Sequence, residues 1–228
     1  MDDPIIRPSL NSVKMTYELA QQPEYQELMT VISPLTGERI NRFAHIHQSA
    51  EDLKNKVKMQ RLVGQKTASC FQRCVGMDAF NACYSTTYDM DQALGSNYHE
   101  RFLTFLKYCQ EKDLTVDGAM TDPKGDRSLS PSQQVDPDLF LHIVERRKDG
   151  IVVRGAKAHQ TGIVNSHEVL VMPTISMTEA DKDYAVCFSV PVDTKGIKLF
   201  MEDNLVIPEN WKKDYWIEEI QNLVDMKL

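Results

Sequence analysis

The sequence has no long hydrophobic run, no basic block and few cysteines, and each of these absences excludes a class of protein. A membrane-spanning helix needs about 18 to 20 consecutive apolar residues, and no stretch approaches that length. The net charge is −7 at neutral pH, which argues against a broad nucleic-acid-binding surface. The first four residues contain two acids and a proline, so we expect no secretory signal. These features predict a globular protein without a membrane or nucleic-acid partner.

The five cysteines also restrict the environment in which the protein works. They stand at positions 70, 74, 83, 109 and 187 of a 228-residue chain, an odd number without the dense spacing of a small disulfide-rich domain. This usage suits a reducing compartment, and we therefore expect a cytoplasmic protein.

The pattern of apolar residues changes character near the middle of the chain. Helical spacing dominates the first half, whereas β-branched runs and turn residues dominate the second. We predict an α+β fold, with an N-terminal helical domain in residues 1–115 and a β domain in residues 116–198. Strands are expected at residues 151–153, 168–172 and 184–190, and a turn at Asp149 and Gly150.

Local signals place individual helices within this plan. Pro23 divides the first 35 residues into two short helices, Ser49 is an N-cap, and Asn97 with Glu100 resembles a capping box. We also expect a helix after Asp136, because four apolar residues lie at near-helical spacing behind it. These four residues are Leu139, Phe140, Ile143 and Val144.

Cys70 and Cys74 are the first candidates for chemistry. They stand four residues apart in a stretch predicted to be helical from Gly64 to about Tyr88, which would place both thiols on one helical face. Two soft ligands can hold part of an iron–sulfur cluster, but a complete site requires four. A single C-x3-C spacing is a weak signal that by itself favours two core thiols, so both interpretations remain open.

Two further segments have the composition of ligand-binding loops. Residues 120–127 combine glycine, which permits close backbone approach, with the cations Lys124 and Arg127, which suit a phosphate. Residues 155–162 place His159, Gln160 and Thr161 donors among small residues after a strand. Neither segment fits the glycine fingerprints of nucleotide-binding loops, and a solvated surface loop or a hairpin is the competing interpretation.

Several stretches together closely resemble the 4-hydroxybutyryl-CoA dehydratase branch of the flavin-dependent 4-hydroxyphenylacetate 3-hydroxylase family. The resemblance extends from about residue 3 to about residue 198 without large gaps, which makes it far more specific than any single motif. The cysteine pair distinguishes this branch from the hydroxylases, which have no cluster. The matching stretches are residues 7–9, 15–20, 41–44, 64–81, 117–127 and 150–162.

The resemblance implies a fold and a reaction. The implied architecture is acyl-CoA-dehydrogenase-like, with an N-terminal helical domain, a middle β domain and a C-terminal helical bundle. The implied activity is that of a lyase and isomerase, which dehydrates 4-hydroxybutyryl-CoA to crotonyl-CoA and isomerises vinylacetyl-CoA. It uses FAD for one-electron transfer and a [4Fe-4S] cluster as a Lewis acid. An acyl-CoA substrate and a homo-oligomer, a tetramer in the family, are also implied.

The resemblance assigns roles to residues of this chain. It implies that Cys70 and Cys74 are cluster ligands. The implied FAD-contacting residues are Met120, Thr121, Asp122, Pro123, Lys124, Gly125, Asp126, Arg127, His159, Gln160, Thr161 and Gly162.

The chain departs from the family pattern in its last part. The family's two remaining cluster ligands and its acid–base residues belong to the C-terminal part, so we expect only a partial β domain, a missing helical bundle and no activity in this chain alone. Residues 199–228 do not resemble the family. A back-translation of Leu199 to Lys213, shifted by two bases, does resemble it, which suggests a frameshift near Lys198.

Two other functions stay open on the sequence. One is a flavin-dependent aromatic hydroxylase of the 4-hydroxyphenylacetate 3-monooxygenase type. The other is a non-catalytic fragment that binds flavin or a partner subunit.

Overall fold

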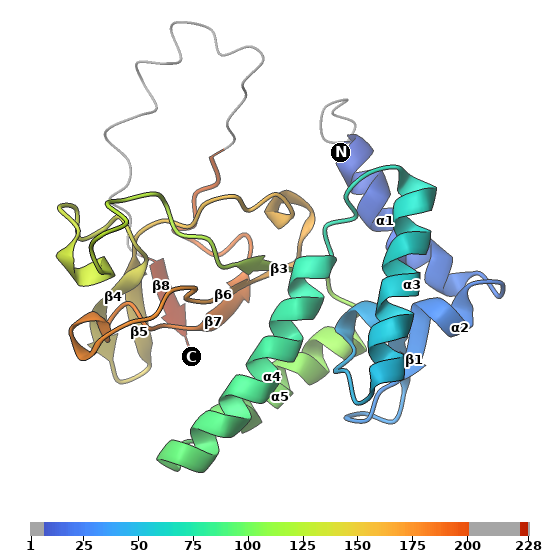
Figure 1. The fold of residues 1–228 in the computed structure, drawn as a ribbon, viewed down its shortest axis with the longest axis horizontal. Helices are drawn as coiled ribbons and strands as arrows, with labels where there is room; N and C mark the ends of the chain where they lie inside the picture. Colours follow the sequence, from blue (N-terminus) through green and yellow to red (C-terminus); the bar gives the residue numbers. More distant parts are fainter. Residues whose placement is uncertain (1–6, 201–223, 228) are drawn as a thin grey trace, which may run out of the picture. The chain divides into compact units, whose positions relative to one another are not determined.

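The structure, a computed structural model, describes residues 7–200 and 224–227. The described helices are α1 (Arg7–Gln21), α2 (Gln26–Met29), α3 (Ala50–Thr67), α4 (Cys74–Leu94) and α5 (Tyr98–Glu111) (Figure 1). The strands are β1 (Thr30–Ile32), β2 (Arg39–Asn41), β3 (Val116–Ala119), β4 (His142–Arg147), β5 (Gly150–Arg154), β6 (Glu168–Val171), β7 (Phe188–Pro191) and β8 (Val224–Lys227). Short 3-10 helices are η1 (Arg42–Ala44), η2 (Pro131–Gln133), η3 (Ile163–Asn165) and η4 (Glu179–Asp181).

The chain folds as two compact units. One comprises Met1–Gly118 and Thr161–Glu168, and we call it the helical unit. The other comprises Ala119–Gln160 with the described residues from Val169 onward, and we call it the β unit. The predicted mixed α and β composition is confirmed, with helices before residue 112 and strands predominating after it. The predicted domain limits at residues 115 and 198 remain predictions. The predicted frameshift also remains a prediction, and most of residues 199–228 lies outside the described part.

The described strands pair in three sheets. In the helical unit β1 and β2 form an antiparallel pair in which Thr30 lies opposite Asn41. A second sheet has the strand order β3-β6-β7. In the β unit β4, β5 and β8 form an antiparallel sheet, with a bulge between Ile143 and Glu145.

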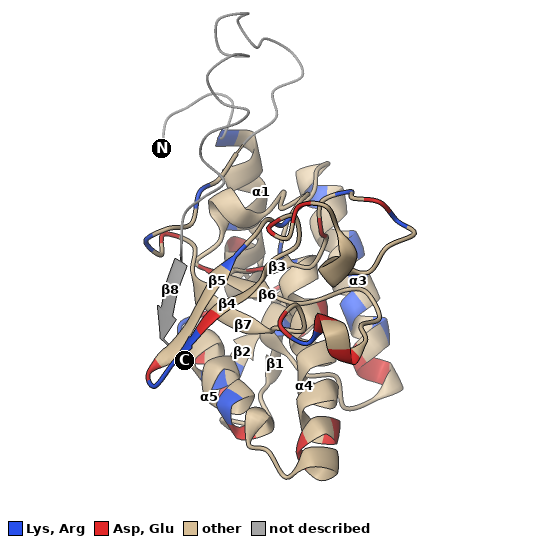
Figure 2. Ribbon diagram, turned by 90° about the vertical axis from the view of Figure 1, so that its left-hand side faces the viewer, with Lys and Arg blue, Asp and Glu red and all other residues tan. Residues whose placement is uncertain are grey.

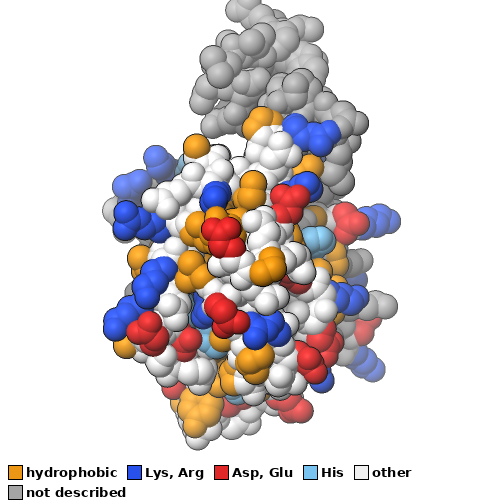
Figure 3. All heavy atoms as spheres, turned by 90° about the vertical axis from the view of Figure 1, so that its right-hand side faces the viewer, with side chains coloured by type: hydrophobic (Ala, Val, Ile, Leu, Met, Phe, Trp, Pro, Cys, Tyr) orange, Lys and Arg blue, Asp and Glu red, His pale blue; other side chains and the backbone are white. Residues whose placement is uncertain are grey.

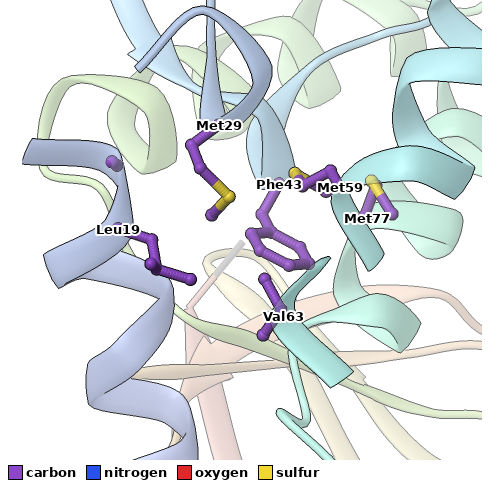
Figure 4. Close-up of a cluster of buried hydrophobic side chains, with 7 residues drawn as sticks. Leu19, Met29, Phe43, Met59, Val63 and Met77 are labelled. Carbon is purple, nitrogen blue, oxygen red and sulfur yellow. The ribbon is translucent and has the colours of Figure 1, made fainter. Parts of the chain in front are cut away.

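Helices α1, α2, α3 and α4 of the helical unit enclose a hydrophobic core. Figure 4 shows Phe43 lying among Leu19, Met29 and Val63, with Met59 and Met77 beside it. Three of the side chains in this cluster are methionines, whose flexible thioethers fill irregular gaps between helices. Cys109 of α5 is also fully buried.

Helix α4 begins in close contact with β3. A Cβ atom on Gly76 would lie 2.1 Å from the carbonyl oxygen of Val116, which is backbone and cannot move aside. At its other end α4 ends at Leu94, six residues beyond the predicted end at Tyr88, and is followed by Gly95 in the left-handed conformation. Helix α5 runs beside α4, where Phe80 and Phe105 have ring centroids 6.1 Å apart (Figure 1).

Charged residues of both signs are mixed along the chain. Figure 2 shows Lys or Arg positions interspersed with Asp or Glu positions along α3 and around the turn between β4 and β5. On the face that carries α1, α2 and α3, hydrophobic side chains also lie among charged ones (Figure 3). None of the described helices is both long enough and apolar enough to cross a membrane.

The predicted helix after Asp136 is wrong. Leu139 N–H donates to the Asp136 carbonyl at 3.2 Å, so one turn forms there and no helix follows. Residues His142–Arg147 instead form β4, which pairs with β5 across a turn at Lys148 and Asp149, one residue earlier than predicted. The β-branched run of β5 supplies a hydrogen-bonding partner, and this tertiary pairing outweighs the near-helical spacing of the apolar residues.

The strand predicted at 184–190 is shorter than expected. Only Phe188–Pro191 forms β7. The alternation that prompted the prediction is real, since Tyr184, Val186 and Phe188 are buried while the residues between them are more exposed. Before Phe188 this side-chain alternation accompanies a turn and irregular backbone instead of a ladder of strand hydrogen bonds.

Candidate functional site

Cys70 and Cys74 do not share a helix, so this part of the prediction is wrong. Helix α3 continues through Gly64 and ends at Thr67, where Ala68 adopts a left-handed conformation with φ of +49°. Cys70 lies in the following loop and is exposed, whereas Cys74 is the first residue of α4 and is half-buried. We call residues 70–74 the cysteine loop.

The surroundings of Cys74 favour its protonated form. Burial raises the pKa of the Cys74 thiol above its ordinary value, and the charge of Cys70, four residues earlier, raises it further. The two cysteines stand at the two ends of the cysteine loop, with Cys70 exposed and Cys74 half-buried.

A strained turn lies between the two cysteines. Gln72 has a φ of +61°, and the N–H of Arg73 donates to the carbonyl of Phe71 at 2.8 Å. This hydrogen bond spans two residues and closes a γ-turn of the rare, strained kind. Gln72 is buried, with 6% of its surface exposed, so the turn folds inward between two more exposed thiols.

Arg73 anchors the end of the cysteine loop. Its guanidinium is 2% exposed, pairs with the Asp113 carboxylate at 2.7 Å and donates to Oγ1 of Thr16 at 3.2 Å. The same group lies over the rings of Tyr17 and Phe43, at 4.4 and 5.1 Å from their centroids. The start of α4, and with it Cys74, is thereby fixed to α1 and the core.

The β unit brings two of the predicted cofactor segments together. The N–H of Ala158 donates to the carbonyl of Thr121 at 2.8 Å, which joins residues 120–127 to residues 155–160. Lys157 strengthens this junction, since its ammonium group donates to the Asp122 carboxylate at 2.6 Å and to the Met120 carbonyl at 3.1 Å. A third bond reaches the Met172 carbonyl at 2.9 Å.

Lys157 is a residue that the sequence interpretation did not single out. Its side chain is 10% exposed and that of Asp122 is 8% exposed, so the pair is largely withdrawn from water. A lysine placed between two alanines after a β-branched strand was the available signal. Asp122 consequently serves as the partner of Lys157 within the protein.

The remaining residues of the 120–127 segment divide into scaffold and exposed cations. Gly125 packs closely against the side chains of Gln134 and Leu139. Asp126 accepts from the backbone and hydroxyl of Ser128 at 2.9 and 2.6 Å. Lys124 and Arg127 are exposed, and Pro123 lies between them and the junction.

The predicted residues 159–162 are divided between the two units. His159 is exposed with φ of +59°, and Gln160 donates to the Ala158 carbonyl at 2.6 Å within the β unit. Thr161 and Gly162 belong to the helical unit, where Thr161 is exposed. A Cβ atom on Gly162 would lie 3.3 Å from Cβ of Gln72, so this glycine packs directly on the cysteine loop.

Asp117 is a second residue that the sequence interpretation did not assign a role. It is 3% exposed in β3, and within the described part of the chain its Oδ2 atom has no hydrogen-bond partner. Burial raises the pKa of its carboxyl group to about 6. Its other oxygen lies 2.8 Å from the position of a Cβ atom on Gly162. The only signal in the sequence was an acid enclosed between Val116 and Gly118.

The cysteine pair does not make a complete metal site by itself. Among residues 7–200 and 224–227, no group of three or more His, Cys, Asp or Glu side chains is arranged to hold a metal ion. The donor set supplied by this loop is therefore two thiols, half of the four ligands that a [4Fe-4S] cluster takes.

Comparison with known proteins identifies the family. A family model described as 4-hydroxyphenylacetate 3-hydroxylase N terminal matches residues 1–220. The chain belongs to this family. The match reaches beyond residue 198, so the assignment of residues 199–228 to a non-family tail remains a prediction.

Within the family, the chain is similar to a dehydratase. It is 71% identical over 197 residues to 4-hydroxybutyryl-CoA dehydratase/vinylacetyl-CoA-Delta-isomerase of Clostridium aminobutyricum, covering 86% of this chain and 40% of that protein. A solved oxygen-tolerant archaeal 4-hydroxybutyryl-CoA dehydratase from N. maritimus is 55% identical with a TM-score of 0.83, covering 86% of this chain and 39% of that one. The chain thus spans about two fifths of the length of these relatives.

The hydroxylases are more distant. The oxygenase component of 4-hydroxyphenylacetate 3-monooxygenase from Thermus thermophilus is 27% identical, over 89% of this chain and 41% of that protein. A structure of such an oxygenase component complexed with FAD has a TM-score of 0.67 at 26% identity, over 86% of this chain and 40% of that one. The resemblance to the dehydratase branch is therefore confirmed over the greater part of the chain.

Proposed function

We propose that this chain forms the N-terminal part of a 4-hydroxybutyryl-CoA dehydratase and vinylacetyl-CoA Δ-isomerase. The observation that carries the proposal is the 71% identity to the clostridial dehydratase over 197 residues, a span of chain that includes Cys70 and Cys74. The complete protein would bind an acyl-CoA, convert 4-hydroxybutyryl-CoA to crotonyl-CoA, and act as a cytoplasmic homo-oligomer. Its architecture would be acyl-CoA-dehydrogenase-like, with a C-terminal helical bundle beyond this chain.

Cys70 and Cys74 fit one side of a [4Fe-4S] cluster. Cys70 is exposed and Cys74 is half-buried, so both thiols can be reached by ligands from outside the loop. The other two ligands must come from a part of the complete protein that the described residues do not include. When bound, the cluster would supply a Lewis acid for the leaving hydroxyl group. The role of this chain is to hold two of its ligands at a fixed spacing.

The β unit fits part of a flavin site. The proposed contacts are residues 120–127 and 159–162, of which Lys124 and Arg127 are exposed cations able to meet the pyrophosphate of FAD. Lys157 and Asp122 contribute by holding the two segments together. The likeness to an oxygenase component complexed with FAD supports the same assignment. When bound, FAD would supply one-electron transfer.

Complementation tests this function. The chain would be co-expressed anaerobically with the C-terminal three fifths of the clostridial dehydratase, and 4-hydroxybutyryl-CoA dehydration, bound iron and bound flavin would be measured. We expect activity from the mixture, and loss of iron and activity with Cys70→Ser or Cys74→Ser. Cys187→Ser, which changes an exposed thiol in the β unit, is the matched control.

Other outcomes would support the alternatives. Iron-free protein that hydroxylates a phenol with reduced flavin would instead place the chain with the monooxygenases. Bound flavin with no iron, and no effect of either cysteine substitution, would indicate a flavin-binding fragment without the cluster. Either result contradicts the dehydratase assignment.

A further inference from the structure

Asn165 connects three segments of the helical unit that lie far apart in the sequence. It is the last residue of η3, and its side-chain amide donates to Oε1 of Gln72 at 2.9 Å and to Oγ of Ser9 at 2.9 Å. Ser9 belongs to α1, and Gln72 is the central residue of the cysteine loop. One side chain therefore joins the first helix, the loop between the two thiols and η3.

Gln72, which accepts the hydrogen bond from Asn165, has a strained backbone conformation. A non-glycine residue at positive φ is strained and persists only when its surroundings impose this conformation. At Gln72 this conformation sets the direction in which the chain enters α4 at Cys74. A relaxed Gln72 would open the γ-turn and change the separation of Cys70 from Cys74.

Gly162, three residues before Asn165, also packs against Gln72. A Cβ atom on Gly162 would lie 3.3 Å from Cβ of Gln72 and 3.4 Å from its carbonyl oxygen, so a side chain at this position would press on Gln72. The hydroxyl of Ser166 donates to the Gly162 carbonyl at 2.9 Å and the N–H of Asn165 donates to the same carbonyl at 3.1 Å. Packing by Gly162 and hydrogen bonding by Asn165 thus act on the same residue.

We propose that Asn165 is a positioning residue for the cysteine pair, and that its amide keeps Cys70 and Cys74 close enough to bind one soft metal centre together. This inference rests on the proposed function, which makes the two thiols metal ligands. Asn165 acts through Gln72, because within the described structure its side-chain amide donates to Gln72 and Ser9. Its removal should leave each thiol reactive but impair binding that needs both.

A trivalent arsenical measures this property without iron. Phenylarsine oxide condenses with two neighbouring thiols: two As–S bonds form, two S–H bonds break, the As–O bond is lost and one water leaves, with arsenic remaining trivalent. The reduced full-length chain would be titrated with phenylarsine oxide in competition with 1,2-ethanedithiol. Cys70→Ser and Cys74→Ser identify the bridged pair, and iodoacetamide reports the reactivity of single thiols.

The variants separate positioning from general stability. Asn165→Leu removes both donated hydrogen bonds, and we expect it to weaken arsenical binding about tenfold, while single-thiol alkylation stays unchanged. Asn165→Asp should retain binding within about twofold, because the Gln72 amide can rotate to donate to the new carboxylate and Ser9 can also donate. Asn11→Leu, an exposed position on α1, is the matched control.

Two results would overturn the inference and are distinguishable. If the wild-type chain bridges Cys70 and Cys74 and Asn165→Leu bridges them equally well, Asn165 has no positioning role while the ligand assignment stands. If the wild-type chain does not bridge them at all, the ligand assignment fails and the inference fails with it. If Asn165→Leu does not fold, the amide hydrogen exchange rate of Arg73 is measured in Asn165→Ala instead. An opened γ-turn must accelerate this exchange, so an unchanged rate would also show that Asn165 has no positioning role.

Discussion

At the residue scale, Arg42, Arg73 and Asp117 are buried charged groups that differ in how fully their polar atoms are satisfied. The Arg42 guanidinium donates to the carbonyls of Leu28 and Thr30 at 2.7 and 2.8 Å. Arg73 has a carboxylate partner, as described above. Asp117 has only the Gly118 N–H to favour its charged form, so its ionisation is opposed by burial.

Asp117 should make the stability of the helical unit depend on pH. Its pKa is about 6 in the folded chain against an ordinary value of 3.8, so the folded state binds more protons and its stability falls as pH rises from about 4 to 6. Asp117→Asn removes this cost, and we expect the variant to be about 2–3 kcal/mol more stable than the wild type at pH 8. The difference should vanish near pH 4.

Urea unfolding at pH 4, 6 and 8 measures this difference directly. Asp89→Asn, which changes an exposed acid on α4, is the control. Its difference from the wild type in free energy of unfolding should be small and should not grow between pH 4 and pH 8. A stability difference for Asp117→Asn that is constant across this range would contradict the raised pKa.

At the element scale, the start of α5 shows a cap supplied from another helix. Asn97 occupies the N-cap position but its side chain makes no capping hydrogen bond, so the predicted capping box with Glu100 is wrong. The Asp91 carboxylate, from the last turn of α4, accepts from the N–H groups of Tyr98 and His99 at 2.8 and 3.0 Å. Its negative charge also lies favourably at the positive end of the α5 dipole.

Replacing the side chains of Asp91 and Asn97 by alanine should therefore affect the start of α5 differently. Asp91→Ala leaves two helix N–H groups without their acceptor, and we expect amide exchange at Tyr98 and His99 to accelerate about tenfold. Asn97→Ala should leave both rates nearly unchanged. Hydrogen bonds lower the pKa of Asp91, so the cap stays in place until the pH falls below the ordinary range of a carboxyl group. Equal effects of the two substitutions would refute the assignment.

At the scale of the whole molecule, the chain spans only part of the length of its relatives. It spans 40% of the clostridial dehydratase, and within its described part no group of three or more His, Cys, Asp or Glu side chains is arranged to hold a metal ion. Four-ligand clusters gain their stability from complete thiolate or imidazole coordination. A half-site that is well ordered therefore does not by itself provide a stable cluster.

We accordingly predict that the chain alone is inactive. After anaerobic purification and reconstitution with iron and sulfide, it should hold substoichiometric iron and show no dehydration of 4-hydroxybutyryl-CoA. Colorimetric iron and sulfide determination with a coupled crotonyl-CoA assay provides the measurement. Stoichiometric iron together with dehydratase activity in the isolated chain would show that two thiols suffice here.

Much of the fold could be predicted because its signals are local. The Ser49 side chain caps α3 by accepting from Asp52 N–H at 3.2 Å, as its position before two acids indicated. The break at Pro23 was also correct, and the turn predicted at Asp149 and Gly150 lies one residue earlier, at Lys148 and Asp149. In each case the residues that determine the structure are a few positions apart, so the sequence order itself displays the interaction.

The candidate site could be predicted only in part. The sequence by itself selected Cys70 and Cys74 and the two loop segments, because their composition and family resemblance are visible in the linear chain. Only the tertiary structure decided that the thiols lie on a strained loop, that Asp117 is buried and that Asn165 holds Gln72, a partner 93 positions away. Such contacts depend on which distant segments the folded core brings together, and no local pattern encodes that choice.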